Sequence, residues 1–266
     1  MTFMVALFDF EFIAATHVEA VAEMVLAHKT VEEGKWPLMI TPNVDQIVKL
    51  GRDENQILKQ ELKRAAWVLP DGQPLVSLSR LIYKNNGLPA RLTGSDFFPV
   101  MWYKVKKLNL KTMFILPSND LGERFMAEHP GVRYYAPPFF QITNEALFQV
   151  VIEHVERIYD EHSPDFLFIG LGFPKQERIV IELYKKLEKQ GRVLPRAFLL
   201  GASFEYYWGQ KKRAPKIWQK LGIEFIYRLI SEPRRMFRRY LVDDLKFLPM
   251  AIAEFRNRRN RPEMNR

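Results

Sequence analysis

Polar residues and glycines follow each of several short apolar runs in this sequence of 266 residues. One of them, Asp71, is a candidate general base, because a carboxylate after the apolar run 65–69 could accept a proton from a hydroxyl group. The residues that follow the other runs include amides and hydroxyls suited to binding sugar hydroxyls. In chain order they are Thr41 and Asn43, Ser118 and Asn119, Gly172 and Gln176, and Gly201 and Glu205.

The stretch FLFIGLGFPKQE at residues 166–177 predicts a strand, a turn and the start of a helix. Its first four residues are all apolar, which is typical of a strand buried on both faces. Gly170 and Gly172 then allow a tight turn, and Pro174 suits the first turn of a helix that runs to about Lys189. Free backbone N–H groups at such a helix start can face an anion such as a diphosphate. The spacing lacks the full G-x-G-x-x-G pattern, which weakens a dinucleotide interpretation.

Strands and helices are expected to alternate along residues 1–208, which predicts an α/β fold with a Rossmann-like, doubly wound and mostly parallel sheet. In such a sheet, ligands bind at the carboxyl ends of the strands, so we expect Asp71 and Gln176 to share one pocket. The expected strands are 5–8, 37–40, 65–69, 111–116, 132–135, 166–169 and 196–200. The expected helices are 17–28, 44–50, 55–64, 74–84, 96–107, 121–128, 144–161 and 175–189, with Thr16 capping the first and Ser95 or Asp96 capping the fifth.

Each candidate residue also has a purely structural interpretation. Asp71 and Gly72 form a common turn pair, and on spacing alone the turn is the favoured interpretation. Thr41 and Asn43 could cap the next helix instead of lining a pocket. Arg91 belongs to a loop that could join the group, or it could be a solvated charge.

The net charge of +9 lies entirely in the last quarter of the chain. Residues 201–266 hold 16 Lys and Arg against 7 Asp and Glu, whereas residues 1–200 hold 24 of each kind. This segment is therefore expected to meet something anionic.

The absence of cysteine excludes disulfides, and no apolar run is long enough to span a bilayer. We expect a cytoplasmic protein.

Residues 209–266 are expected to form a helical basic appendage, with helices near 214–221, 224–230 and 233–255. Arg228, Arg235 and Arg238 would share one helix face if the helix continues through Pro233. Interleaved apolar residues predict an amphipathic segment that lies on anionic membrane. The alternative is a helix that packs on the protein's own core with a solvated arginine face.

No Asp-x-Asp triplet occurs in the sequence, so a carboxylate-held divalent metal is not expected at a diphosphate. No histidines pair at metal-ligand spacing either. Arginines are then the groups available to neutralise a leaving diphosphate. Neither a metal nor a cofactor is predicted.

At the polar strand exits and in the basic C-terminal segment, the sequence resembles the WecG/TagA/CpsF glycosyltransferases of bacterial surface-polysaccharide synthesis. The resemblance extends from about residue 38 to 240, in the family's order. The matching stretches are TPNVDQ (41–46), PDG (70–72), ARLTGSDFFP (90–99), GLGFPKQE (170–177) and GASFEYYWGQKKRAPKIWQKLGIEFIYRLISEPRRMFRRY (201–240).

The resemblance implies an inverting, metal-independent enzyme that moves a sugar, often N-acetylmannosamine, from a UDP donor. The acceptor would be a sugar linked to undecaprenyl diphosphate at the cytoplasmic face of the membrane. It also implies that Asp71 is the base, that Thr41 and Asn43 line its pocket, and that Arg91 and Gln176 lie near the substrate.

The family's arginine-rich appendage, here residues 209–266, is implied to fold over the site and to bind the membrane. Arg228, Arg235 and Arg238 match arginines that would meet the diphosphate. The sequence departs from the family's usual pattern at two places: Pro70 replaces the usual small residue before Asp-Gly, and Glu205 stands where an aspartate is common. The stretch around Glu205 is the one that would touch the donor. The donor could therefore be glucose or an N-acetylated uronic acid.

Two other classes of function stay open from the sequence. A nucleic-acid-binding protein could use the basic tail, although a continuous apolar face favours lipid over nucleic acid. A regulator could bind a nucleotide sugar without catalysis. A homo-oligomer is also left open.

Overall fold

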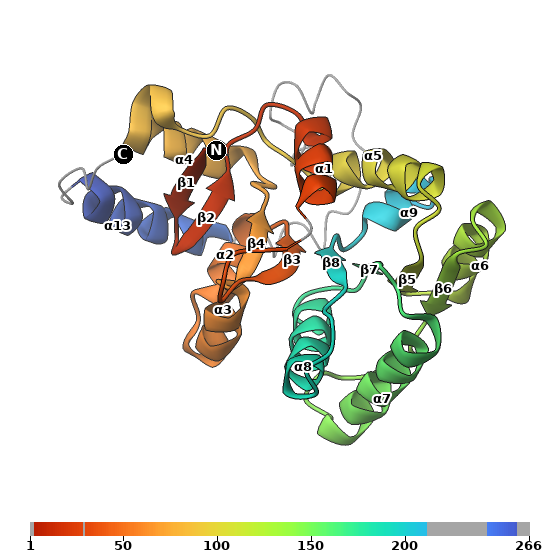
Figure 1. The fold of residues 1–266 in the computed structure, drawn as a ribbon. Helices are drawn as coiled ribbons and strands as arrows, with labels where there is room; N and C mark the ends of the chain where they lie inside the picture. The colour runs from red at the N-terminus through yellow and green to blue at the C-terminus, as the bar shows by residue number, and fades with distance from the viewer. Residues whose placement is uncertain (1–2, 29, 212–243, 260–266) are drawn as a thin grey trace.

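The computed structural model describes residues 3–28, 30–211 and 244–259, and a six-stranded parallel sheet lies at its centre (Figure 1). The strand order is β4-β3-β8-β7-β5-β6, and every neighbouring pair is parallel. The predicted α/β, Rossmann-like class is confirmed, and all six strands overlap predicted ones. They are β3 (Trp36–Ile40), β4 (Ala65–Val68), β5 (Thr112–Ile115), β6 (Val132–Tyr135), β7 (Phe166–Ile169) and β8 (Arg196–Leu199).

Helices cover both faces of the sheet because successive strand side chains point to opposite sides. In β7, Leu167 and Ile169 join one core, with α2, α3, α4, α7 and α8, whereas Phe166 and Phe168 join the other, with α1, α5, α6 and α9. The bounds are α1 (Val18–Ala27), α2 (Val44–Leu50), α3 (Gln56–Leu62), α4 (Gln73–Tyr83), α5 (Gly94–Lys107), α6 (Asn119–Glu128), α7 (Glu145–His162), α8 (Lys175–Lys189) and α9 (Ser203–Tyr207). Short 3-10 turns are Asp53–Asn55 and Lys84–Asn86.

The second of these cores consists largely of aromatic rings. Phe114 stacks on Phe125 with ring centroids 4.4 Å apart, and Phe98 meets Phe204 edge-on at 4.7 Å. A Cβ atom on Gly170 would lie 2.4 Å from the ring of Phe204. Glycine is therefore needed after β7 for close packing, and it does not adopt a positive φ there.

The first predicted strand does not join the main sheet. β1 (Met4–Leu7) pairs antiparallel with β2 (Phe10–Ile13), which was not predicted, to form a separate hairpin. Phe8 and Asp9 connect the two strands with positive φ angles of 51° and 68°. Two successive positive φ values give the primed turn that suits a hairpin, but such turns usually contain Asn-Gly or Asp-Gly.

The predicted N-caps of two helices differ from the observed ones. His17 precedes α1 and makes no side-chain cap, so Thr16 is not the N-cap. Thr93 caps α5 by accepting a hydrogen bond from the backbone N–H of Asp96, so neither Ser95 nor Asp96 is the N-cap. Both helices nevertheless begin within three residues of the predicted start.

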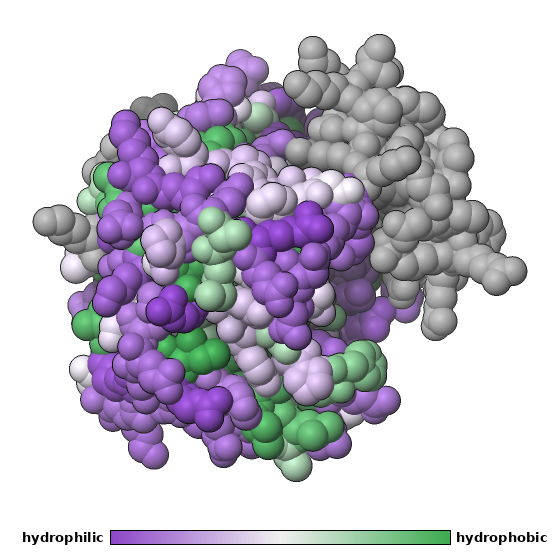
Figure 2. All heavy atoms as spheres, turned by 90° about the vertical axis from the view of Figure 1, so that its right-hand side faces the viewer, coloured by the Kyte–Doolittle hydropathy of each residue, from purple (hydrophilic) through white to green (hydrophobic). Residues whose placement is uncertain are grey.

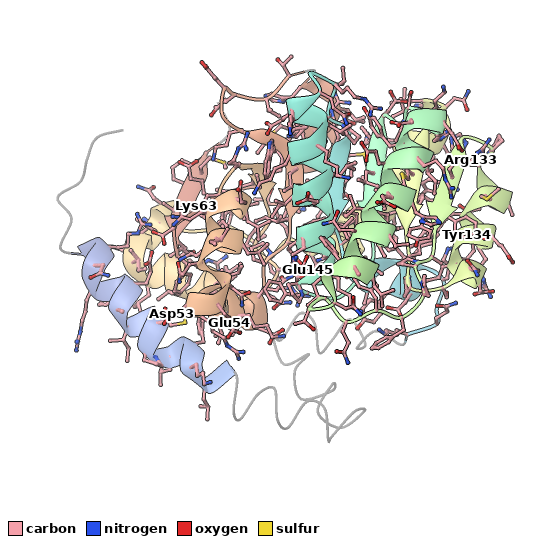
Figure 3. All side chains as sticks on the ribbon, turned by 90° about the horizontal axis from the view of Figure 1, so that it is seen from below. Asp53, Glu54, Lys63, Arg133, Tyr134 and Glu145 are labelled. Carbon is pink, nitrogen blue, oxygen red and sulfur yellow. The ribbon has the colours of Figure 1, made fainter. Side chains whose placement is uncertain are left out.

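The last described helix, α13 (Phe247–Arg259), follows a 3-10 turn (Asp244–Lys246) and packs on α2 and α4. The backbone N–H of Phe8 donates to Glu254 Oε1 at 3.0 Å, and the rings of Phe8 and Phe247 are 5.5 Å apart. Seen from below, α13 runs beside the segment that carries Asp53 and Glu54 (Figure 3). The predicted helices 214–221 and 224–230 lie outside the described residues, as does the first part of 233–255.

The face shown in Figure 2 is mostly hydrophilic, with small hydrophobic areas between polar side chains. Such scattered apolar residues are normal on a protein surface. Within the described ranges, no helix has the length and apolar character that crossing a bilayer requires.

Candidate active site

The polar exits of neighbouring strands are joined at the carboxyl edge of the sheet. The hydroxyl group of Thr41, after β3, donates to the backbone oxygen of Leu199 in β8 at 3.2 Å. The backbone N–H of Asp71, after β4, donates to the oxygen of Pro42 at 3.3 Å. The structure therefore places the predicted base one strand from Thr41, at the edge where an open parallel sheet binds ligands.

Gln176, in the first turn of α8, joins this edge from β7. Its side chain is buried, and its Oε1 accepts a hydrogen bond from the backbone N–H of Gly201 at 3.2 Å. A small pocket at this point brings Gln176 and Thr41 together, whereas Asp71 lies at the same edge but outside the pocket's lining. The lining consists of Ile40, Thr41, Pro42, Gln46, Leu50, Leu62, Phe173, Gln176, Glu177 and Leu199.

Asn43 caps α2, as the structural interpretation of this residue predicted. Its side chain accepts a hydrogen bond from the backbone N–H of Gln46 at 3.1 Å. Gln46 returns the contact, because its Oε1 accepts from the backbone N–H of Asn43 at 3.2 Å. This reciprocal capping box fixes the backbone that leaves β3. A contact between Asn43 and substrate stays a prediction.

Asp71 and Gly72 do not form the turn that their spacing favoured. Gly72 has extended angles of −179° and 128° and serves as the N-cap of α4. The half-buried Asp71 therefore leads from β4 into a helix, at the edge where the other polar exits lie. Its role as a base stays a prediction.

The loop that carries Arg91 lies against the exit of β4. The backbone N–H of Leu92 donates to the oxygen of Pro70 at 3.0 Å. A Cβ atom on Gly94 would lie 3.0 Å from the hydroxyl oxygen of Ser203, so the start of α5 also approaches the exit of β8. Arg91 is half-buried at this junction, and its contact with substrate stays a prediction.

Gly172 and Glu205 occupy the exits of β7 and β8. A Cβ atom on Gly172 would meet no atom within 4 Å. The peptide bond between Phe173 and Pro174, which follows in the same turn, is cis. The carboxylate of Glu205, in α9, pairs with Lys211 at 2.8 Å. Both residues lie at the predicted edge of the sheet, and their binding roles stay predictions.

The three predicted arginines, Arg228, Arg235 and Arg238, lie outside the described residues. Their approach to a diphosphate therefore stays a prediction. Across residues 3–28, 30–211 and 244–259, no group of three His, Asp or Glu side chains could hold a metal ion.

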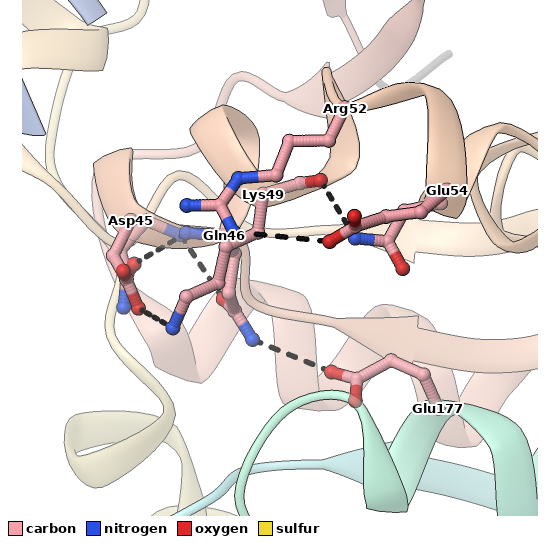
Figure 4. Close-up of polar contacts among 8 residues, drawn as sticks. Asp45, Gln46, Lys49, Arg52, Glu54 and Glu177 are labelled. Atoms are coloured by element: carbon pink, nitrogen blue, oxygen red, sulfur yellow. Dashed lines mark hydrogen bonds and ion pairs between the residues drawn. The ribbon is translucent and has the colours of Figure 1, made fainter. Parts of the chain in front are cut away.

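Glu177 is a buried acid that the sequence reasoning treated only as part of a helix start. Burial raises its pKa from 4.5 to about 7, against the opposing effect of a hydrogen bond from Gln176. Its Oε1 also accepts from Nε2 of Gln46 across the pocket (Figure 4). The sequence carried a signal for the burial of Glu177, though not for its partners, because Glu177 precedes the apolar Val180 and Ile181 by three and four residues and shares their helix face.

The fold and this edge together define a class of protein. A Rossmann-like parallel sheet whose strand exits bear hydroxyl, amide and carboxyl groups is suited to hold a polar ligand outside the carboxyl ends of its strands. Comparison with known families makes the class specific. The chain belongs to the glycosyl transferase WecG/TagA/CpsF family, whose profile matches residues 5–261.

Individual relatives agree with this assignment. The chain is similar to N-acetylglucosaminyldiphosphoundecaprenol N-acetyl-beta-D-mannosaminyltransferases from several bacteria. It is 27% identical to that of Bacillus spizizenii over 213 residues, which cover 78% of this chain and 76% of the relative. It is 27% identical to that of Staphylococcus aureus strain MRSA252, covering 74% and 72%, and 28% identical to that of Bacillus subtilis strain 168, covering 74% and 73%.

Proposed function

We propose that this chain transfers a sugar from a UDP-sugar to a saccharide linked to undecaprenyl diphosphate, with inversion at the anomeric carbon. Family membership over residues 5–261 carries the proposal. The names of the relatives support the substrates, because they state an N-acetylmannosaminyl group and a lipid-diphosphate-linked N-acetylglucosamine acceptor. The transferred sugar is N-acetylmannosamine or a related hexose.

Asp71 is the proposed general base. Its carboxylate accepts the proton from a hydroxyl group of the acceptor sugar while that oxygen bonds to the anomeric carbon of the donor. The bond between this carbon and the diphosphate oxygen breaks, and its electron pair leaves with UDP. The position of Asp71 at the strand exits supports this role, and general-base help is typically worth about 10²–10⁴-fold in rate.

Positive groups are proposed to stabilise the leaving UDP in place of a metal ion. The sequence offers Arg228, Arg235 and Arg238 for this purpose, and arginine binds phosphate oxygens in a bidentate manner. Backbone N–H groups near Gly172, at the start of α8, would add to the stabilisation. Full activity in the presence of a metal chelator is the expected result.

The donor sugar is proposed to depend on the exit of β8. Glu205 lies in α9 there, and its carboxylate is held by Lys211 at 2.8 Å. Thr41, Asn43, Arg91 and Gln176 would bind the remaining polar groups of the substrates. The departure at Glu205 from the family's usual pattern is the reason to test donors other than N-acetylmannosamine.

The enzyme is proposed to act at the cytoplasmic face of the membrane, where a lipid-linked acceptor would lie. The basic C-terminal segment supports this location. Within α13 and the turn before it, Leu245, Leu248 and Ile252 are exposed, whereas Phe247 and Met250 pack against the core.

A donor screen tests the function directly. The protein would be incubated with individual UDP-sugars and a short-chain lipid diphosphate that carries N-acetylglucosamine, and products would be read by mass spectrometry. We expect a mass increase of one sugar residue with one donor class, with and without chelator. Binding of UDP with no product from any donor would favour a regulator, and binding to oligonucleotides but not vesicles would favour a nucleic-acid-binding protein.

A further inference from the structure

The carboxyl group of Glu177 joins the first turns of α2 and α8. Its Oε1 accepts a hydrogen bond from Nε2 of Gln176 at 2.9 Å. The same oxygen accepts a second one from Nε2 of Gln46 at 3.4 Å (Figure 4). The residue is only 3% exposed, and within the described part of the chain its buried Oε2 has no hydrogen-bond partner. Acids are seldom buried so deeply, and an unpaired buried oxygen is costly, so this arrangement calls for an explanation.

The two amides bound to Glu177 are each held from both ends. Oε1 of Gln46 accepts from the backbone N–H of Asn43 at 3.2 Å, and Oε1 of Gln176 accepts from the backbone N–H of Gly201 at 3.2 Å. A backbone N–H can only donate, and an ionised carboxylate can only accept. Each amide must therefore point its nitrogen towards Glu177 and its oxygen towards the backbone.

We propose that Glu177 is a positioning residue, which holds the amides of Gln46 and Gln176 in this orientation and thereby fixes Asn43 and Gln176 for substrate binding. The inference rests on the proposed sugar transfer, in which Asn43 and Gln176 contact substrate. Glu177 is proposed to act through its neighbours, because its carboxyl group is almost fully shielded from solvent and its Oε1 is occupied by the two amides.

The ionisation of Glu177 supports a pH-dependent strength of this positioning. Burial raises its pKa to about 7, while Gln176 and the nearby ammonium group of Lys49 act in the opposite direction. Lys49, on α2, is itself paired with Asp45 at 2.9 Å. A hydrogen bond to an ionised group is stronger than one to a neutral group, so both amides are held more firmly above pH 7 than below it.

A spectroscopic test does not depend on enzymatic activity. The side-chain amide resonances of Gln46 and Gln176 would be followed by ¹H–¹⁵N NMR from pH 5.5 to 8.5, with assignment from Gln46→Ala and Gln176→Ala. Both pairs should shift with one common midpoint near pH 7. In Glu177→Gln, which keeps the shape of the side chain, neither should titrate. Independent midpoints, or titration that persists in Glu177→Gln, would overturn the proposal.

A kinetic test separates this inference from the proposed function. Glu177→Ala should lower kcat/KM per folded molecule by about 10-fold or more, because small misplacements of binding groups are costly. Glu177→Gln should recover most of this loss and remove the pH dependence near 7. The control is Glu182→Gln, a half-buried glutamate on the same helix, which should behave as wild type.

The outcomes are distinct. A wild-type protein that transfers no sugar would refute the proposed function, while the NMR titration would still report on the role of Glu177. An active wild type whose kcat/KM equals that of Glu177→Ala would refute the positioning role. If Glu177→Ala does not fold, the comparison of Glu177→Gln with wild type across pH decides, because a purely structural carboxyl would leave the pH profile unchanged.

Discussion

A single buried carboxyl group makes the stability of this fold depend on pH. The pKa of Glu177 is about 7 in the folded protein against an ordinary value of 4.5, with burial as the main cause. The folded state therefore holds this proton more tightly than the unfolded chain. The stabilising contribution is complete below about pH 4.5 and is lost as the pH rises through 7.

Glu177→Gln should remove this contribution. Between pH 5 and pH 8, wild type should lose about 2 kcal/mol of unfolding free energy more than the variant does, from the pKa difference and about 1.4 kcal/mol per unit. Urea unfolding at both pH values measures this, and the other titrating groups cancel because both proteins contain them. An equal pH dependence in the two proteins would contradict the assignment of the buried acid.

The proposed base can be tested at the same scale. Asp71→Asn keeps the size of the side chain but cannot accept the proton, so kcat should fall by about 10²–10⁴-fold. Because Asp71 is only half-buried, the variant should still fold and bind the donor. The readout is turnover with the best UDP-sugar from the donor screen. A rate close to wild type would remove Asp71 from the mechanism.

The turn between β7 and α8 contains two glycines with different physical roles. A methyl group on Gly170 would lie 2.4 Å from the ring of Phe204, which packs in the aromatic core, whereas one on Gly172 would meet nothing within 4 Å. Gly170→Ala should therefore cost about 1–3 kcal/mol of stability through overpacking. Gly172→Ala is the matched control and should stay within about 0.5 kcal/mol of wild type. Thermal unfolding compares the two, and similar losses in both would mean that backbone conformation matters more than packing.

The parallel sheet was predictable because its strands are continuous apolar runs with polar exits, as in residues 166–169. The β1–β2 hairpin was not, since Phe8 and Asp9 adopt positive φ angles without the glycine or asparagine that usually marks such a turn. Thr93 was missed as a cap because Ser95 and Asp96 are equally good capping types within three residues. Local sequence indicates which residues can cap a helix or form a turn, but tertiary packing determines which of them does so.

The placement of the candidate residues at one edge of the sheet was predictable in the same way, while their roles stay predictions and Asp71 lies outside the pocket that Thr41 and Gln176 line. The edge that gathers Thr41, Asp71 and Gln176 follows from the parallel topology, so their residue numbers could be read from the strand exits. The hydrogen bond between the carboxyl group of Glu177 and Gln46 could not be predicted, because the two residues are 131 positions apart in sequence. A contact of that kind depends on strand order, which the alternation of strands and helices leaves undetermined.

At the scale of the whole molecule, α13 presents one apolar side to the core and another to solvent. Leu248 and Ile252 are 61% and 44% exposed. If this side meets lipid, the double variant Leu248→Glu and Ile252→Glu should bind vesicles containing anionic lipid at least about 10-fold more weakly, since each buried leucine-sized side chain contributes about 1.5–3 kcal/mol.

Sedimentation with vesicles measures this effect. The control is Leu108→Glu, at the end of α5, where a leucine is 54% exposed outside the C-terminal segment. Both proteins should unfold at nearly the wild-type temperature, because surface substitutions seldom change stability by more than about 0.5 kcal/mol. Unchanged vesicle binding by the double variant would show that α13 is not the lipid contact.

The packing of α13 against Phe8, in the turn of the N-terminal hairpin, has a further consequence for the proposed chemistry. Residues 212–243, which include the three arginines, are covalently tethered at Lys211 beside the strand exits and again at Asp244 before the docked helix. Because both ends of this segment are attached, the three arginines stay at an effective concentration in the millimolar range near the strand exits, whatever the dilution of the protein. An enzyme cut before residue 212 would therefore not regain turnover from micromolar amounts of the missing peptide supplied in solution.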